Sequence, residues 1–475
     1  GGIGAKLEPM VSVSILGSWR IAALVATAAL FFAVSIPVDA AEDAPSKAPA
    51  EAAPPESKPK PAEAKPGPAA KPAEALKTKQ PTDTSAEPAA APTADAGGEQ
   101  PASTIRIVYL GKEYEEPLPL SYAEEIITDK GIQGARLMIK EANQAGGFVG
   151  HGFELIEAII PADGDIVAKA KEVLAAGDSF IIADLEPKDL LAVADLPEAK
   201  NSVIMNIRSS ATVLRQEECR DNVFHVIPDL AMRADALGQY LVWKKWPRWF
   251  VMRRDTPEDQ DYLAQIQRAA KRFGAKVVED RVYRLPPGAR NLDSGHQQVQ
   301  TQIPMETQGA PEHDVVWVIN SDDDFGDYLM YRTDMPRPVV GTQGLQATAW
   351  DKSYTESGAM HFQNAIPRIA KRKPVERDYT AWVAIRAIAD SAMKSGKTTP
   401  KELKAYLLSD DFKLEAFKGQ ALSFRTWDHQ MRQPIILGGG TRVPVSTSPQ
   451  EGFLHQTNLT DTLGFDQPES KCKFR

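Results

Sequence analysis

The sequence predicts an α/β protein built from two successive units of mostly parallel β-sheet, each with helices on both faces. From about residue 103 onward, short apolar runs alternate with amphipathic helical stretches, which is typical of parallel strands joined by crossover helices. The alternation occurs once before Pro228 and again after it. The first hundred residues differ in composition, so we expect the folded part to begin near residue 103.

The first unit opens with the apolar segment 104–110, which predicts a strand. A helix is expected over 131–145, because its apolar residues recur at helical spacing and Gly146-Gly147 follow as a stop signal. The same signals predict strands at 153–160, 180–183 and 202–207, and helices at 165–176 and around 190–193.

A second unit of the same kind follows Pro228. Its expected helices lie at 231–243, 262–273, 380–393 and 401–409, and its expected strands at 249–252, 276–283, 315–319, 339–340, 421–425 and 433–437. Trp243 and Trp249 bracket a helix-to-strand connection and are expected to anchor the core of this unit. Because parallel α/β sheets bind ligands beyond the carboxyl ends of their strands, the site is expected in the loops after them.

The N-terminal segment has the features of an exported protein. Residues 21–36 form an uncharged apolar run that follows Arg20 and precedes the small residues around Ala40, which predicts a signal peptide over 10–40. The run is shorter than the ~18 residues of a spanning helix, so export is favoured over anchoring. Residues 41–102 are rich in Ala, Pro, Lys and Glu, which predicts a disordered linker.

Charge and cysteine content narrow the class of function. The formal net charge of −9 argues against a nucleic-acid-binding protein. Cys219 and Cys472 are the two cysteines, and in an exported protein they form either one disulfide or two free thiols. Neither cysteine lies near the signal segment, so the protein is not expected to be a lipoprotein.

Several segments carry a resemblance to a known family. They are 131–147, Ser209 to Thr212, Cys219 to Phe224 and Asp378 to Ala381. In this order the sequence resembles type I periplasmic substrate-binding proteins of ABC transporters, of the branched-chain amino-acid-binding kind. Glu218 to Asn222 and Gly452 to Asn458 are similar to the branch encoded beside pyrroloquinoline-quinone (PQQ)-dependent alcohol dehydrogenase systems.

The resemblance implies two Rossmann-like lobes joined by a three-crossover hinge. The first lobe would combine 103–228 with 368–432, and the second 229–367 with 433–475. It also implies a monomer in the periplasm that binds a small molecule between the lobes and delivers it to an ABC permease in the inner membrane. A PQQ-dependent dehydrogenase is a further expected partner, and no cofactor and no enzymatic activity are expected.

In the family, hydroxyl and backbone groups after the third and fourth strands hold the carboxylate of an amino acid. Ser209, Ser210 and Thr212 match this pattern after the fourth strand. After the third strand, however, this chain has Asp184 and Glu186, and two acids there are expected to repel a carboxylate.

In the second lobe, too, two ligand-binding positions differ from the residues that the family has there. The acid that binds the ammonium group falls near Gln343, which is neutral, and the expected aromatic contact falls near Glu258. Tyr114 or Tyr122 in the long loop after the first strand could wall the cleft instead. These differences predict a solute that is not a simple amino acid.

Other interpretations stay open beside this one. The acids of 322–324 with Asp327 lack the spacing of a calcium loop and are expected to be a solvated turn rather than a metal site. No nucleophile elbow, phosphate loop or zinc-protease motif is present. The alternative function is a scaffold that keeps the fold, binds no ligand and contacts a dehydrogenase.

Overall fold

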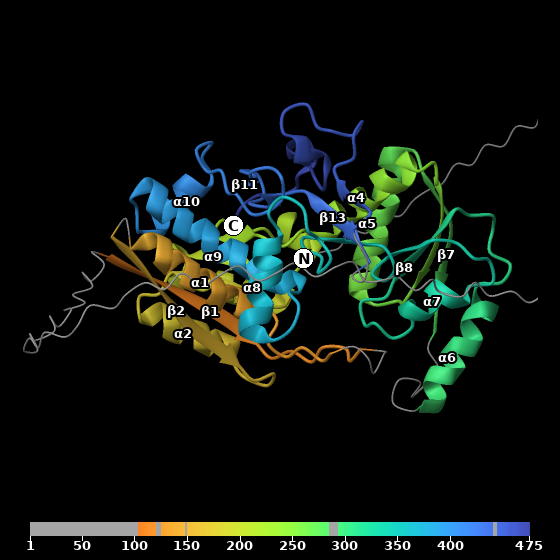
Figure 1. Cartoon of the computed structure of the whole chain (residues 1–475), viewed down its shortest axis with the longest axis horizontal. Coiled ribbons are helices and arrows are strands. Elements are labelled where there is room, and N and C mark those ends of the chain that lie inside the picture. Colours follow the sequence, from red (N-terminus) through yellow and green to blue (C-terminus); the bar gives the residue numbers. More distant parts are fainter. Residues whose placement is uncertain (1–102, 120–124, 148–149, 285–292, 440–443) are drawn as a thin grey trace, which may run out of the picture. The chain divides into compact units, whose positions relative to one another are not determined.

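The computed structural model describes residues 103–119, 125–147, 150–284, 293–439 and 444–475 (Figure 1). The predicted signal peptide, the linker and Tyr122 lie outside these residues. The predicted fold class is confirmed: the described residues form an α/β fold with two parallel sheets.

The first sheet has the strand order β2-β1-β3-β4-β5, and all its neighbouring strands are parallel. Its strands are β1 (Ser103–Lys112), β2 (His151–Ile160), β3 (Phe180–Asp184), β4 (Val203–Asn206) and β5 (Val223–His225). One face packs against α1 (Ile132–Gly146), α8 (Met360–Ala370), α9 (Glu376–Ser395) and α10 (Pro400–Leu407). The other face packs against α2 (Ile166–Ala175) and α3 (Pro187–Ala194).

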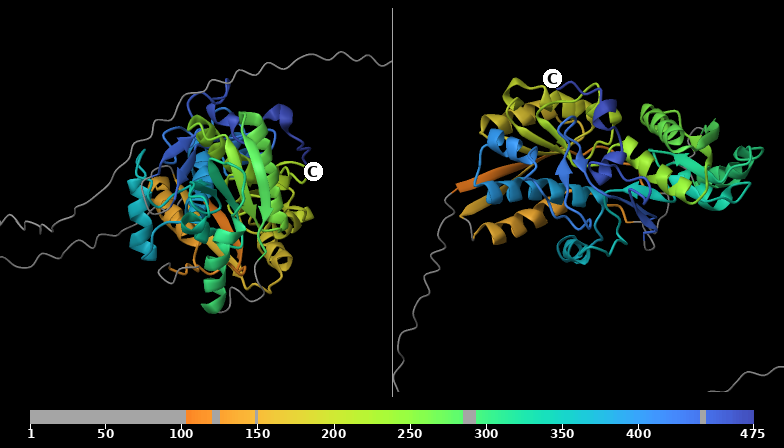
Figure 2. Two further views of the ribbon diagram at one scale, coloured as in Figure 1. Left: turned by 90° about the vertical axis from the view of Figure 1, so that its right-hand side faces the viewer. Right: turned by 90° about the horizontal axis from the view of Figure 1, so that it is seen from above.

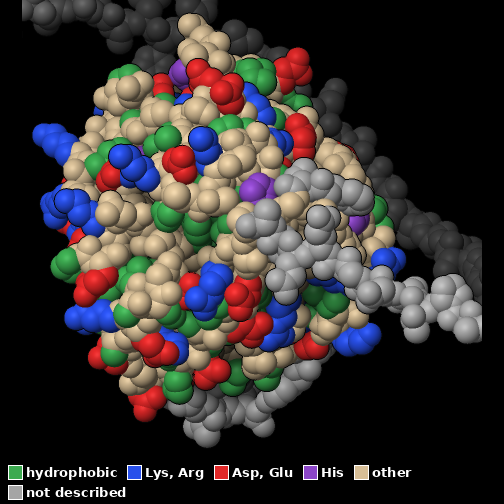
Figure 3. All heavy atoms as spheres, turned by 90° about the vertical axis from the view of Figure 1, so that its left-hand side faces the viewer, with side chains coloured by type: hydrophobic (Ala, Val, Ile, Leu, Met, Phe, Trp, Pro, Cys, Tyr) green, Lys and Arg blue, Asp and Glu red, His purple; other side chains and the backbone are tan. Residues whose placement is uncertain are grey.

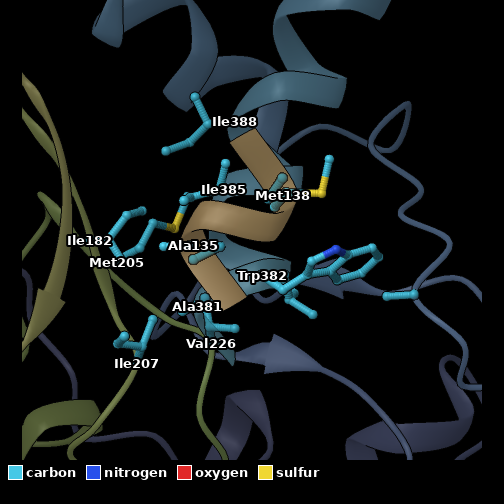
Figure 4. Packing of buried hydrophobic residues seen from close by; sticks show 14 of the residues in the cluster. Ala135, Met138, Ile182, Met205, Ile207, Val226, Ala381, Trp382, Ile385 and Ile388 are labelled. Carbon is cyan, nitrogen blue, oxygen red and sulfur yellow. The ribbon is translucent and has the colours of Figure 1, made fainter. Parts of the chain in front are cut away.

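The alternation of side chains along β1 explains why helices cover both faces. Ile105 and Ile107 belong to the core that contains α1 and α9, whereas Val108 and Leu110 belong to the core that contains α2 and α3. Figure 4 shows the first of these cores, where side chains of α1, α9 and the sheet meet. A strand that is apolar on both faces is what a buried parallel sheet requires.

The second sheet repeats this winding with the order β7-β6-β8-β9. Its strands are β6 (Arg248–Arg253), β7 (Lys276–Val282), β8 (Val315–Ile319) and β9 (Val339–Gly341). Helices α4 (Leu230–Trp243) and α5 (Pro257–Phe273) pack on one face, and α6 (Asp293–Glu306) and α7 (Gly326–Arg332) on the other. Trp249 is fully buried in this core, but Trp243 is 51% exposed, so the prediction that Trp243 anchors the core is wrong.

The chain passes between the cores of the two sheets more than once. The residues on either side of the passages are Val226 and Leu230, Ala347 and Ala349, and Met431 and Ile435. The division into two lobes stays a prediction. If the lobes are defined by these cores, the second boundary falls between Ala347 and Ala349 rather than at 367.

Short strands and turns complete the C-terminal part. β10 (Gln346–Thr348), β13 (Ile435–Gly438) and β14 (Ser446–Ser448) form an antiparallel sheet, and β11 (Ser423–Phe424) pairs with β12 (Met431–Arg432). The 3-10 turns are Pro197–Ala199, Thr212–Arg215, Leu459–Thr462 and Gln467–Glu469. Cys219 and Cys472 form a disulfide with their Cα atoms 5.6 Å apart. The C-terminus therefore lies beside the first sheet and its helices (Figure 2).

On the face drawn in Figure 3, acidic and basic side chains are interspersed. Within the described part of the chain, no helix combines the length and the apolar character needed to cross a membrane.

Candidate functional site

Loops at the carboxyl ends of strands from both sheets line a cavity of about 600 Å³, here called the central cavity. Arg208 and Ser210 reach it from the loop after β4, and Asn320 from the loop after β8. Gln343 reaches it from the loop after β9. This is where parallel α/β sheets place their ligand sites.

Two further cavities adjoin the central one. The first flanking cavity, of about 770 Å³, lies along the loop after β1, and the second flanking cavity, of about 960 Å³, lies along the loop after β4. Arg208 and Arg377 line all three cavities. These two arginines therefore mark the point where the cavities meet.

Two carboxylates hold this pair of arginines. Nη1 of Arg208 lies 3.3 Å from an oxygen of Asp184 and 3.3 Å from an oxygen of Glu116. Nη1 of Arg377 donates to Glu116 at 2.7 Å, and its Nε lies 3.6 Å from Asp184. Nζ of Lys130 donates to the other oxygen of Glu116 at 2.5 Å. Three cations thus share two carboxylates, which leaves one positive charge in excess.

The local fold fixes Asp184 on the side away from the arginines. Asp184 is the last residue of β3, and Tyr109 of the neighbouring β1 donates its hydroxyl proton to Asp184 Oδ2 at 2.7 Å. Burial, followed by the charge of Asp184, raises the pKa of Tyr109 well above its usual value, so this phenol stays a donor. From the sequence, Asp184 was expected to repel the carboxylate of a ligand. In the structure Arg208 and Arg377 neutralise the charge of Asp184 and so offset this repulsion.

The position of Lys130 depends on the glycine that follows it. Gly131 has a φ of +88°, and a Cβ there would lie 2.3 Å from the hydroxyl oxygen of Tyr109. The Gly131 N–H donates to buried Asp378 at 2.9 Å, and the same carboxylate accepts two hydrogen bonds from buried Arg372. The loop before α1 is therefore fastened to α9.

On the side of the first sheet, the ion pairs keep the carboxylate of Glu116 and the guanidinium group of Arg377 in their charged forms. Burial by itself would raise the pKa of Glu116, but Arg377 and Lys130 outweigh it and hold this pKa at about 2. Burial likewise opposes the charge of Arg377, but Asp184 and Glu116 outweigh it and raise the pKa of the guanidinium. Glu116 and Arg377 are therefore both ionised at neutral pH.

The opposite side of the central cavity, at the second sheet, carries both amides and acids, and two of the amides are tightly held. Oδ1 of buried Asn320 accepts the backbone N–H groups of Asp324, Phe325 and Gly326 at 2.8, 2.9 and 2.9 Å. Nε2 of Gln343 donates to the Asn320 carbonyl oxygen at 3.1 Å. Both amides are therefore fixed by the protein itself.

Glu258 is a carboxylate on this side whose surroundings disfavour its charge. It lies in the first turn of α5 and lines the central and second flanking cavities. Although its side chain is exposed in the cleft, the surrounding protein raises its pKa by removing water, and Asp259 and Asp322 raise this pKa further. No cation among the described residues pairs with Glu258.

The structure places the predicted hydroxyl residues together along the second flanking cavity. Ser209, Ser210 and Thr212 all line it, and Ser210 also lines the central cavity. Their hydroxyls are only partly available: Oγ of Ser210 accepts from Arg233 at 3.3 Å, and Oγ of Ser209 accepts from the Ala211 N–H at 3.4 Å. The buried Thr212 hydroxyl has no partner among the described residues.

The other predicted residues are divided among the three cavities. Asp184 lines the first flanking cavity, Glu186 the second and Gln343 the central one. Tyr114 lies beneath Arg208, with its ring centre 4.7 Å from the guanidinium carbon.

Arg208, Arg377, Lys130 and Glu116 were not predicted as site residues. One signal could have found Arg208, which directly follows the predicted strand 202–207. The sequence signal for Arg377 is weaker: this residue directly precedes Asp378–Ala381, one of the segments that carry the family resemblance.

The cluster of acids after β8 shows internal pairing. Asp324 lies 3.3 Å from Arg254 and accepts from Asn320 at 2.6 Å. Within the described ranges, no group of three or more His, Cys, Asp or Glu side chains is arranged to hold a metal ion.

Comparison with known proteins gives one family and many related folds. The sequence profile of a family described as periplasmic binding protein matches residues 121–440. No curated protein sequence matches the chain.

Among solved structures, a branched chain amino acid ABC transporter periplasmic ligand-binding protein from Burkholderia xenovorans LB400 is similar. It superposes with a TM-score of 0.60 at 14% identity, over 78% of this chain and 99% of that one. A leucine-, isoleucine-, valine-, threonine- and alanine-binding protein from Brucella ovis, in a closed conformation, has a TM-score of 0.57 at 15% identity, over 79% and 100%. An ABC transporter solute binding protein from R. palustris in complex with benzoate has a TM-score of 0.54 at 12% identity, over 78% and 100%. At these identities the likeness is one of fold.

Proposed function

The chain belongs to the periplasmic binding protein family, and from this premise we propose that it is the solute receptor of an ABC importer. It captures a small molecule in the central cavity and presents it to a permease in the inner membrane. The observation that carries this proposal is the cavity itself, which loops after strands of two separate sheets line together. A binding role of this kind needs no chemical step.

The proposed cellular location is the periplasm. The support is the family match and the predicted signal peptide over 10–40, with residues 41–102 as a linker. The Burkholderia xenovorans and Brucella ovis proteins of similar fold are named as periplasmic or amino-acid-binding proteins, and the first is assigned to an ABC transporter. These names favour an ABC permease as the partner.

The proposed solute is not a simple amino acid. The position that would carry an ammonium-binding acid is Gln343, a neutral amide. Its Nε2 donates hydrogen bonds to the backbone oxygen of Asn320 and to the carboxylate of Asp323. Its Oε1 accepts a hydrogen bond from the hydroxyl of Thr342 at 2.5 Å. The solute-binding protein from R. palustris, which was solved with benzoate, is a protein of this fold whose ligand has no ammonium group.

A link to PQQ-dependent alcohol oxidation is a further part of the proposal. It rests on the sequence resemblance of 218–222 and 452–458 alone. Co-purification of a PQQ-dependent dehydrogenase with this protein from its native host would support the link. Its repeated absence, under growth on alcohols, would remove this part of the proposal.

The test is a binding screen on the mature chain. Thermal shift and calorimetry against organic acids, alcohols, aldehydes and amino acids should find one class that binds and stabilises the protein. A ligand at a hundred times its Kd adds about 2.7 kcal/mol to the free energy of unfolding. No binding by any class would contradict the proposal.

A pair of matched variants shows whether a binding compound occupies the central cavity. Val375 lines this cavity, so Val375→Trp is expected to block it and to abolish binding. Val445 is exposed and lines none of the three cavities, so Val445→Trp is the control and should bind as the unchanged protein does.

A further inference from the structure

The two arginines that line all three cavities keep hydrogen-bond donors in reserve. A guanidinium group has five N–H donors in a planar fork. Arg208 uses Nη1 for its carboxylate partners, and among the described residues its Nε and Nη2 make no hydrogen bond. Arg377 uses Nη1 for Glu116 and Nε for the ion pair with Asp184, and its Nη2 likewise has no partner there.

The free donors of Arg208 are held in place rather than left to move. Arg208 lies on the ring of Tyr114, which favours one plane for the guanidinium. Tyr114 is itself fixed, because its hydroxyl donates to Asp189 at 2.6 Å and accepts the Glu186 N–H at 3.1 Å. Fixed donors of this kind bind an oxyanion with little loss of side-chain entropy.

The charge balance indicates which oxyanion fits. Arg208, Arg377 and Lys130 together carry three positive charges, and Asp184 and Glu116 carry two negative charges. Within this cluster of five side chains one positive charge therefore remains. Of the other charged groups that line the central cavity, Arg233 pairs with Glu376, and Glu258, Asp323 and Asp327 belong to the side of the second sheet. A single carboxylate supplies one negative charge, and its planar geometry matches the N–H pair of a guanidinium. A phosphate dianion would leave an uncompensated negative charge.

We propose that Arg208 and Arg377 recognise a carboxylate group, so that the solute is a small monocarboxylic acid. This inference rests on the proposed function and gives its ligand class. Arg208 and Arg377 would contact the ligand, whereas Asp184 and Glu116 act through them as positioning residues. The hydroxyls of Ser209 and Ser210, which already accept hydrogen bonds from the protein, take a secondary part.

The experiment uses sets of compounds that share a carbon skeleton. Calorimetry at pH 7 compares benzoate with benzamide and benzyl alcohol, and pentanoate with pentanamide and 1-pentanol. Inorganic phosphate and sulfate test other oxyanions. The acid of at least one set should bind at least about tenfold more tightly than its amide and alcohol, as hydrogen bonds to a charged group require. Tighter binding of phosphate or sulfate would overturn the carboxylate assignment.

Variants then assign the effect to the two arginines. Arg208→Gln and Arg377→Gln should each lower the affinity for the acid by at least about tenfold. Arg208→Lys keeps the charge but loses the planar fork, so a loss smaller than that of Arg208→Gln is expected. It serves as the test if a glutamine variant fails to fold.

The matched control is Arg253→Gln. Like Arg208, Arg253 lies near the end of a strand and pairs with two carboxylates, those of Asp280 and Asp255. Unlike Arg208, it lines none of the three cavities. Acid binding should be unchanged in this variant. An equal loss in Arg253→Gln and Arg208→Gln would show a general effect of the substitution and would overturn the assignment.

The positioning role of Asp184 has a separate readout. Asp184→Asn should weaken acid binding, and Asp184→Glu should restore part of it, at equal melting temperatures. Failure of the two inferences is distinguishable. Binding of an alcohol or amine that Arg208→Gln leaves intact would overturn the carboxylate assignment and leave the receptor function standing. No binding of any compound would overturn both.

Discussion

The two sheets share one winding order, but the loops at their carboxyl ends carry different chemistry. Beside the first sheet, β2-β1-β3-β4-β5, the loop after β4 presents Arg208 and the first turn of α9 presents Arg377, and carboxylates hold both. In the second sheet, β7-β6-β8-β9, the loops present amides held by backbone groups, with Asn320 and Gln343 as examples. The shared topology determines where the site lies, and the loops determine what it binds.

Two glutamates show the same contrast. Glu116, on the side of the first sheet, has a pKa held at about 2 by Arg377 and Lys130 in spite of its burial. Glu258, on the side of the second sheet, has a raised pKa because the protein removes its water and other carboxylates surround it. One side of the cleft therefore stabilises ionised carboxylates, and the other does not.

The largest expected effect comes from breaking the buried pair behind the first side. Asp378→Asn leaves Arg372 without its buried partner, so we expect a loss of about 3–5 kcal/mol in the free energy of unfolding. Chemical denaturation followed by circular dichroism measures it. Asp390→Asn in the same helix is the control, because Asp390 has longer ion pairs at 3.9 and 3.6 Å. Equal losses in the two variants would contradict the role given to Asp378.

The next effect concerns the C-terminal tail, which is bonded to the loop before β5 and to α4. Cys472 is bonded to Cys219, and Gly464 donates to Asp235 of α4 at 2.8 Å. Replacing both cysteines by serine should lower the free energy of unfolding by about 2–4 kcal/mol. Reduction of the unchanged protein should give the same loss. A double variant as stable as the oxidised protein would show that the tail needs no covalent link.

A smaller effect is expected on the second side. Asn320→Ala removes the acceptor of three buried backbone N–H groups, so we expect a loss of about 1–3 kcal/mol by the same denaturation measurement. Exposed Asn201 provides the control, and Asn201→Ala should change stability by less than about 0.5 kcal/mol. A neutral Asn320→Ala would mean that solvent replaces this amide.

The smallest effects are those of pH, and their signs differ between the two sides. The pKa of Glu116 is lower in the folded chain than its usual 4.5, so its stabilisation is complete above about pH 4.5 and is lost as pH falls toward 2. The pKa of Glu258 is raised, so its contribution favours folding at low pH and is lost as pH rises through the raised value.

Glutamine variants test these signs. Glu116→Gln should lower the melting temperature at pH 7 and leave it nearly unchanged near pH 2. Glu258→Gln should raise the melting temperature slightly at pH 7 and have no such effect below pH 4. Melting curves across this pH range measure both. The same sign for both variants at pH 7 would contradict the contrast between the two sides.

The fold could be predicted from the sequence because strand and helix periodicities agree with the burial of both sheets. The short elements β5, α7, β10, β12 and β14 were missed, and three longer helices were missed or misplaced for physical reasons. Helices α6 and α8 were not predicted, since each contains an internal proline, Pro304 or Pro367, which ordinarily indicates a break. Helix α5 begins at Pro257 rather than at 262, because Thr256 caps it and the proline occupies its first turn.

The site was predicted less completely. Its location after the strands followed from topology, and the structure brings Ser209, Ser210 and Thr212 to one cavity there. The arginine pair was missed because Arg208 and Arg377 are far apart in the sequence, and only the contact between α9 and the first sheet brings them to the same carboxylates. Asp184 taken alone is expected to repel a ligand carboxylate, whereas its ion pairs with Arg208 and Arg377 remove that repulsion.

The most direct measurement is a crystal structure of the protein with the tightest-binding acid from the calorimetric series. The account predicts that both carboxylate oxygens lie within about 3.2 Å of guanidinium nitrogens of Arg208 and Arg377. A carboxylate bound by the hydroxyls of Ser209, Ser210 or Thr212, with neither arginine in contact, would contradict it.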